Sequence, residues 1–142
     1  MMRVLIDTNV ILDVLLNRKE FLEVSSAVIK LLLERKYRGF VAATTLTNVY
    51  YVVHQATKKK DEAMIAVNKT LQWCEVATVN RRVLDVARLS CMKDFEDAVQ
   101  AAAAQDFGID IVVTRDKAGF SDSGLKVYSP EEFLETLNDG KQ

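Results

Sequence analysis

Acidic residues follow two short apolar runs of this sequence. The first run ends at Asp7, and a second run ends two residues before Asp116. Asp94 and Asp97 open an Ala-rich segment, and Ala is the strongest helix former. In an open α/β sheet, ligands bind beyond the carboxyl ends of the strands, where the following helices begin. The sequence therefore predicts that three separate segments bring carboxylates to one edge of a sheet.

Carboxylates gathered at one edge repel one another unless a cation neutralises them. Mg²⁺ prefers oxygen ligands and is often shared between a few carboxylates and a substrate phosphate, and Mn²⁺ suits the same ligands. Each acid also has a purely structural interpretation, because Asp7 and Asp94 can cap helices and Asp116 can open a turn. The coincidence of three segments favours a metal site over three separate caps.

The composition excludes several kinds of protein. The 142 residues suit one soluble domain, and 19 basic against 20 acidic side chains leave a net charge of −1, so any nucleic-acid binding must come from local clusters. No glycine-rich phosphate or dinucleotide motif is present. The single histidine, His54, argues against a ribonuclease with paired histidines and against a Ser-His-Asp triad. Cys74 and Cys91 are predicted to be reduced, buried thiols. Metal-assisted hydrolysis of a phosphodiester fits these residues best.

Strands and helices alternate along the chain, which predicts a parallel sheet covered by helices on both faces. The expected strands are 3–6, 40–43, 75–79, 111–114 and 126–128, and the expected helices are 8–16, 20–35, 45–55, 61–73, 80–91, 94–107 and one that begins at Pro130. Residues 1–137 are expected to form a single domain and residues 138–142 a frayed tail. Acids interrupt the apolar N-terminus, so we expect neither a signal peptide nor a membrane span, and a cytoplasmic location.

Four segments together resemble the PIN-domain nucleases, and among them the toxin ribonucleases of the VapC type. The resemblance covers nearly the whole chain and rests on VLIDTNVILD (4–13), TLTNVYYVV (45–53), DFEDAVQAAAA (94–104) and IVVTRDKAGF (111–120). It implies a Rossmann-like α/β/α sandwich with a central parallel sheet. It also implies endoribonuclease activity that depends on Mg²⁺, with Mn²⁺ able to substitute.

The resemblance assigns roles to the acids at the sheet edge. Asp7, Asp97 and Asp116 match the first, third and fourth acids of the family and are the expected catalytic metal ligands. Asp94 is either an auxiliary ligand or only the cap of its helix. Thr114 matches a polar residue beside these acids, and its hydroxyl can position a water molecule or a phosphate.

Four further residues are candidates for binding the substrate. Thr8 and Asn9 belong to the motif of Asp7, and they either brace that acid or contact the substrate. Arg115 and Lys117 flank Asp116, where a phosphate must approach.

Asn48 departs from the family pattern, because relatives generally carry a Glu there as their second acid. An asparagine can still ligate through its carbonyl oxygen or hold a metal-bound water. It removes one negative charge, however, so metal affinity should fall. Two hypotheses follow: an active toxin ribonuclease that includes Asn48 in its catalytic site, or a catalytically weakened module that binds RNA or a protein.

The resemblance also implies partners. The substrate is expected to be RNA, and relatives are commonly restrained by a small antitoxin that covers the acidic groove. Relatives also form homodimers, for which residues 20–36 and 45–55 offer apolar surface. No membrane association is expected.

Overall fold

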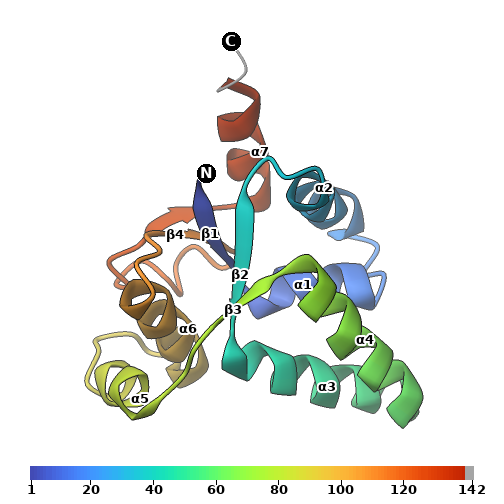
Figure 1. Cartoon of the computed structure of the whole chain (residues 1–142), viewed down its shortest axis with the longest axis horizontal. Coiled ribbons are helices and arrows are strands. Elements are labelled where there is room, and N and C mark those ends of the chain that lie inside the picture. Colours follow the sequence, from blue (N-terminus) through green and yellow to red (C-terminus); the bar gives the residue numbers. More distant parts are fainter. Residues whose placement is uncertain (140–142) are drawn as a thin grey trace.

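A central parallel sheet organises the protein. The computed structural model describes residues 1–139, and within them five strands pair in the order β3-β2-β1-β4-β5 (Figure 1). The strands are β1 (Arg3–Ile6), β2 (Arg38–Ala42), β3 (Glu75–Ala77), β4 (Ile111–Val113) and β5 (Lys126–Tyr128). All four strand pairs are parallel. The parallel sheet predicted from the sequence is confirmed.

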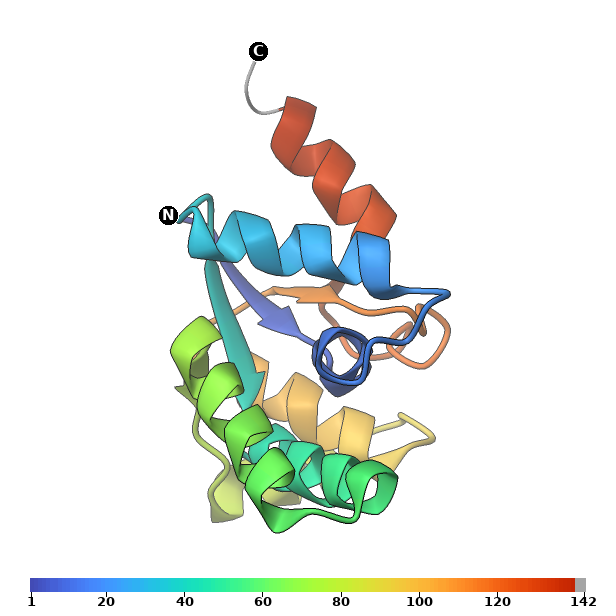
Figure 2. The same ribbon diagram turned by 90° about the vertical axis from the view of Figure 1, so that its right-hand side faces the viewer.

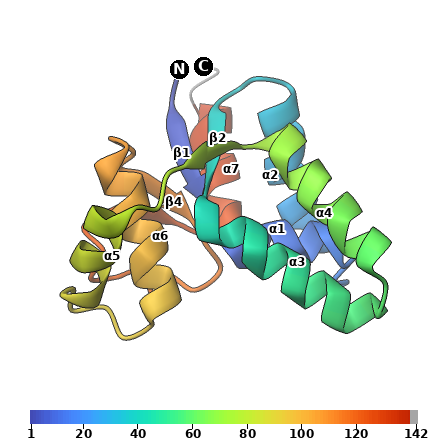
Figure 3. The ribbon, with the colours of Figure 1, turned by 60° about the horizontal axis from the view of Figure 1, so that its bottom comes forward.

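Helices cover both faces of this sheet. One face carries α5 and α6, and the other carries α1 to α4 (Figures 1 and 3). The helix α7 lies beside α2, on the same face as α1 (Figure 2). The helices are α1 (Thr8–Leu15), α2 (Leu22–Leu33), α3 (Ala43–Thr57), α4 (Lys60–Trp73), α5 (Arg81–Arg88), α6 (Phe95–Asp106) and α7 (Pro130–Asp139). The predicted α/β/α sandwich is therefore confirmed.

Side chains of β1 alternate between the two cores, as the pleat of a strand requires. Val4 and Ile6 are fully buried against α1 to α4 and α7, whereas Leu5 is fully buried against α6. The alanines of α6 are small enough to bring this helix close to the sheet. The close approach of α6 places the acids at its N-terminus beside the end of β1.

The strand order places a switch point between β1 and β4. From β1 the chain first builds β2 and β3 on one side, and it later adds β4 and β5 on the other side. Open α/β sheets bind ligands at such a switch point, beyond the carboxyl ends of the strands. Asp7 follows β1 and Asp116 follows β4, so these acids flank the switch point.

The element boundaries differ from expectation by a few residues. β2 runs directly into α3 without a loop, and α5 ends three residues earlier than predicted. Asn80 caps α5, as expected, by accepting a hydrogen bond from the Val83 amide at 3.1 Å. Helix α7 continues to Asp139, inside the predicted tail, and residues 140–142 lie outside the described part of the chain.

One prediction about the cysteines is wrong. Both thiols are free and Cys74 is buried, but Cys91 is exposed because it follows the end of α5 in an irregular connection. Burial raises the pKa of the Cys74 thiol to about 12, which keeps it protonated and unreactive. No helix within residues 1–139 is long and apolar enough to cross a membrane.

Candidate active site

Asp7 is a buried carboxylate held by two side chains from distant segments. Its side chain accepts a hydrogen bond from Thr114 Oγ1 at 2.8 Å and another from Gln100 Nε2 at 3.1 Å. Although Asp7 occupies the N-cap position of α1, its side chain makes no capping hydrogen bond. The capping interpretation of Asp7 is therefore wrong. Burial raises the pKa of Asp7, and the two hydrogen bonds oppose this effect.

Asp94 does cap its helix. Its Oδ1 atom accepts a hydrogen bond from the backbone amide of Asp97 at 2.9 Å, which fixes the first turn of α6. Asp97 stands in that turn and is half-buried. Burial, as the largest cause, and the charges of the neighbouring carboxylates together raise the pKa of Asp97 to about 7; these neighbours are Asp7, Asp94, Glu96 and Asp116. Like charges from three segments thus act on Asp97.

Asp116 faces Asp97 across a short loop. Its Oδ1 atom accepts a hydrogen bond from the Gly119 amide at 3.0 Å, so the predicted turn also forms. A Cβ atom on Gly119 would overlap the Asp116 carboxylate and lie 3.2 Å from Asp97 Oδ2. The two carboxylates therefore converge on the same small space. Thr114 Oγ1 also accepts a hydrogen bond from the backbone amide of Asp116 at 3.0 Å. Because the same hydroxyl donates to Asp7, it links Asp116 to Asp7.

Glu96 belongs to this group, although it is not among the site residues predicted from the sequence. Its Oε1 atom accepts hydrogen bonds from Thr8 Oγ1, Asn48 Nδ2 and Gln100 Nε2. Gln100 is a second residue that was not predicted. It is fully buried, and its Oε1 atom accepts a hydrogen bond from the Thr8 backbone amide at 3.3 Å. The signal for both was a Glu and a Gln one helical turn apart at the start of an otherwise Ala-rich helix.

Three of the residues predicted to belong to the site make hydrogen bonds to other side chains of the protein. Thr8 Oγ1 lies 2.8 Å from Thr45 Oγ1 in the interior, and its side chain makes no hydrogen bond to Asp7 among the described residues. Asn9 is exposed, and its Oδ1 atom accepts a hydrogen bond from Arg18 Nη1 at 3.3 Å. The Thr114 hydroxyl is buried and donates to Asp7. Thr8 and Thr114 thus lie where they can support the acids.

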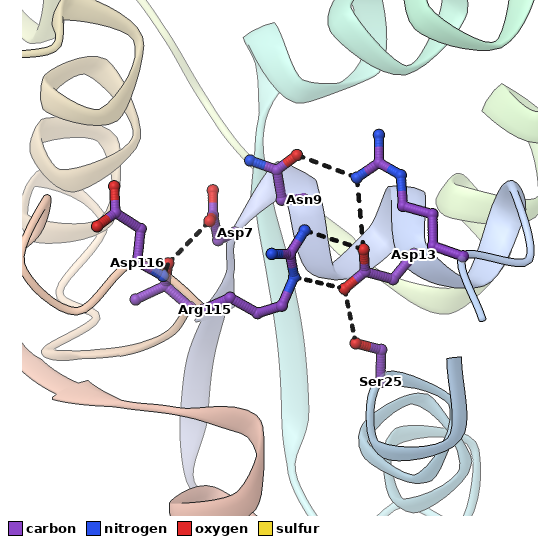
Figure 4. Close-up of polar contacts among 8 residues, drawn as sticks. Asp7, Asn9, Asp13, Ser25, Arg115 and Asp116 are labelled. Atoms are coloured by element: carbon purple, nitrogen blue, oxygen red, sulfur yellow. Dashed lines mark hydrogen bonds and ion pairs between the residues drawn. The ribbon is translucent and has the colours of Figure 1, made fainter. Parts of the chain in front are cut away.

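The two basic residues beside Asp116 form ion pairs. Arg115 donates two hydrogen bonds to Asp13, at 2.8 and 3.1 Å (Figure 4). Its guanidinium also lies over the Phe21 ring, 3.7 Å from the ring centroid. Asp13 is fully buried and also accepts a hydrogen bond from Ser25 Oγ at 3.0 Å. Lys117 pairs with Glu132 at 2.8 Å at the surface, where such a pair is weak and easily exchanged.

A cavity of approximately 490 Å³ opens beside these acids. Its lining includes Asp94, Asp97 and Asp116, together with Lys93 and Asp122. Its volume lies within the range of ordinary ligand sites. The cavity therefore gives a polar ligand access to the carboxylates.

The donor set fits a hard divalent cation. Asp94, Glu96 and Asp97 each offer a carboxylate oxygen, and these atoms lie within 4.8 Å of one another. Asp7 adjoins this group because Gln100 bonds both Asp7 and Glu96, and Asp116 adjoins it because Asp116 and Asp97 both border the space next to Gly119. An all-oxygen set of carboxylates suits Mg²⁺ or Mn²⁺ rather than a metal that prefers sulfur or imidazole.

Comparison with known proteins identifies the family. A family model described as a PIN domain matches residues 3–118, which include Asp7, Asn48, Asp97 and Asp116. The chain belongs to the PIN domain family. The resemblance predicted from the sequence motifs is confirmed.

This PIN domain is also similar to individual proteins named VapC or VapBC. It is 28% identical over 141 residues to Ribonuclease VapC1 of Aquifex aeolicus (strain VF5), with 96% of each chain covered. Its fold matches VapBC2 from Rickettsia felis bound to a DNA fragment from their promoter, with a TM-score of 0.70, 14% identity, and coverage of 90% of this chain and 98% of that one. It also matches Mycobacterium tuberculosis VapC20, described as a sarcin-ricin loop cleaving toxin, with a TM-score of 0.68, 15% identity, and coverage of 86% and 95%.

Proposed function

We propose that this PIN-domain protein is an endoribonuclease that hydrolyses RNA with the help of Mg²⁺ or Mn²⁺, and that it is the toxin of a toxin–antitoxin pair. The observation that carries the proposal is the convergence of Asp7, Asp97 and Asp116 at the switch point of the sheet. The likeness to Ribonuclease VapC1 over nearly the full length of both chains supports RNA as the substrate.

The acids would hold the cation, and their neighbours keep them in place. A bound Mg²⁺ or Mn²⁺ supplies positive charge for the scissile phosphate and acidifies water. Asp7, Asp97 and Asp116 are the proposed ligands. Thr114 and Gln100 hold the buried Asp7 carboxylate in one orientation by donating to its two oxygens. This arrangement needs no reorganisation when the substrate arrives.

Positive side chains near the cavity would bind the RNA backbone. Lys93 lines the cavity, and Lys117 can exchange its exposed partner Glu132 for a phosphate. Arg115 is also a candidate for binding phosphate, but at a cost in free energy. To reach a phosphate it would have to break both hydrogen bonds to the buried Asp13 carboxylate. Asn9 is exposed beside Arg18 and can reach a neighbouring phosphate.

The proposed partners follow from the solved structures. A toxin–antitoxin complex from Klebsiella pneumoniae has the same fold, so we infer that a small antitoxin covers the acidic cavity of this protein. We also propose a homodimer and a cytoplasmic location. Leu33 on α2 and Tyr51 on α3 are exposed apolar side chains within the segments expected to form the dimer.

Cleavage of single-stranded RNA tests the proposal. Purified protein, freed of any partner, should cut a fluorescently labelled RNA in Mn²⁺ or Mg²⁺ and lose this activity in EDTA. Asp97→Asn should abolish cleavage, whereas Glu62→Gln, an exposed acid in the first turn of α4, should leave it unchanged. If the wild-type protein binds RNA but never cleaves it in either metal, it is instead a binding module that has lost activity.

A further inference from the structure

Asn48 occupies the family's second acid position, and its amide faces another carboxylate. The Nδ2 atom of Asn48 donates a hydrogen bond to Glu96 Oε1 at 3.0 Å. An ionised carboxylate only accepts hydrogen bonds, so the NH₂ end of the amide must be the end that faces it. Asn48 therefore does more than leave a gap in the site: it binds a carboxylate that comes from a different helix.

Three donors from three helices hold the Glu96 carboxylate. Besides Asn48 on α3, Thr8 on α1 and Gln100 on α6 donate to the same Oε1 atom, each at 3.2 Å. Within residues 1–139, Oε2 of Glu96 makes no hydrogen bond. One oxygen is thus fixed by neutral donors, and the other is left free to bind a ligand.

The Glu96 carboxylate is close to the other acids of the site. An oxygen of its carboxylate is within 4.8 Å of an oxygen of Asp97 and of Asp94. The Nε2 atom of Gln100 bridges Glu96 and Asp7, with distances of 3.2 and 3.1 Å. The carboxylate is therefore adjacent to both the first and the third acid of the family pattern.

We propose that Glu96 is the fourth carboxylate of the metal site, supplied by α6 in place of the acid missing from α3, and that Asn48 is its positioning residue. This inference rests on the proposed function, because it concerns the same metal site. It restores the negative charge that Asn48 removes: Asp7, Glu96, Asp97 and Asp116 together give four carboxylates. A Glu at position 48 would instead stand opposite Glu96 and repel it.

Metal binding without RNA tests the assignment directly. In calorimetric titration with Mn²⁺, Glu96→Gln should weaken the affinity at least about tenfold, and Asn48→Ala should weaken it by about 10- to 100-fold because Glu96 loses a donor. Glu62→Gln makes the same chemical change in the first turn of α4 and should bind Mn²⁺ like the wild type. The melting temperature in EDTA separates loss of metal binding from loss of folding.

Moving the carboxylate from position 96 to position 48 gives a sharper test. Asn48→Glu alone should lower the melting temperature in EDTA and weaken Mn²⁺ binding. The double variant Asn48→Glu with Glu96→Gln reverses the hydrogen bond, since the new Gln can donate to the new Glu. It should recover Mn²⁺ affinity and RNA cleavage relative to Glu96→Gln.

Two results would overturn the assignment: wild-type Mn²⁺ affinity in Glu96→Gln, or a folded double variant that binds no better than Glu96→Gln. If the double variant does not fold, the affinity of Glu96→Gln decides alone. A wild-type protein that binds Mn²⁺ but cleaves no RNA contradicts the proposed function and leaves the ligand assignment intact. A wild-type protein that cleaves RNA, with Glu96→Gln unchanged in affinity, contradicts only the assignment.

Discussion

Three carboxylates of this protein lie in surroundings that disfavour their charged form. Asp7 is almost completely buried, and Asp97 and Glu96 are partly buried beside it. Burial raises the pKa of all three, and the neighbouring acids add to the effect at Asp97 and Glu96. Groups perturbed by burial and by like charges in this way are typical of metal and catalytic sites. The same perturbation makes the stability of the metal-free protein depend on pH.

The metal-free protein should lose stability as the pH rises. The pKa of Asp97 is raised to about 7 when folded, whereas an unfolded carboxyl titrates near its ordinary value of about 4. The folded state therefore binds more protons between these values, and its stability falls as the pH rises from about 4 through about 7. Melting temperatures in EDTA should decrease over this window. Asp97→Asn should flatten the slope, and a wild-type melting temperature that rises steadily there would contradict the prediction.

Gly119 allows the close approach of two acids. A methyl group at this position would overlap the Asp116 carboxylate and crowd Asp97 Oδ2. Gly119→Ala should therefore displace Asp116 and reduce both Mn²⁺ affinity and cleavage by about tenfold or more. Circular dichroism should show that the variant stays folded. Unchanged Mn²⁺ affinity in Gly119→Ala would mean that Asp116 does not need its present position.

At the scale of elements, the site depends on how α1, α6 and the loop after β4 are joined. Gln100 ties α6 to the start of α1, because it bonds both the Thr8 amide and the Asp7 carboxylate. Asp13, in turn, ties α1 to the loop after β4 through Arg115 (Figure 4). Arg115 immediately precedes Asp116, so this ion pair also limits where Asp116 can lie.

Removing the charge of Asp13 should loosen this connection. Asp13→Asn should lower the free energy of unfolding by about 2–3 kcal/mol, because the buried side chain loses charge-assisted hydrogen bonds to Arg115 and Arg18. Urea denaturation measures the change. Asp85→Asn removes a comparable ion-pair partner at the surface of α5 and should cost much less, because water screens that pair. Equal losses in the two variants would show that burial of the Asp13 pair is unimportant.

At the scale of the whole molecule, the proposed metal binding would be linked to folding. Folding brings carboxylates that are more than 100 residues apart in sequence, such as Asp7 and Asp116, to one edge of the sheet. Their mutual repulsion opposes folding when no cation is present. A cation that binds only the folded state removes this cost and adds its own binding free energy.

Mn²⁺ should therefore stabilise the whole protein. At a concentration 100 times its Kd, the gain is about 2.7 kcal/mol, which corresponds to a rise of about 10 °C in melting temperature for a chain of this size. Differential scanning fluorimetry with Mn²⁺ and with EDTA measures the difference. Asp97→Asn should melt higher than the wild type in EDTA yet gain little from Mn²⁺. An equal gain in both proteins would place the stabilising cation elsewhere.

The sequence by itself determined the elements and most of the acids. Apolar runs ending in Asp7 and before Asp116 predicted two strands with acids at one edge of the sheet, and Asp94 with the following alanines predicted α6 and its cap. These features are local, because strand pleating, helical propensity and capping depend on residues within a few positions of one another. The family motifs added the expected roles of the acids.

Only the tertiary structure decided what each polar side chain binds. It showed that Asp7 is held by Thr114 and Gln100 rather than capping α1, and that Arg115 is paired with the buried Asp13. It also brought Glu96 on α6 to Asn48 on α3, two residues that are 48 positions apart in sequence. No local pattern specifies such contacts, because they depend on how closely the small alanines of α6 let that helix approach the sheet.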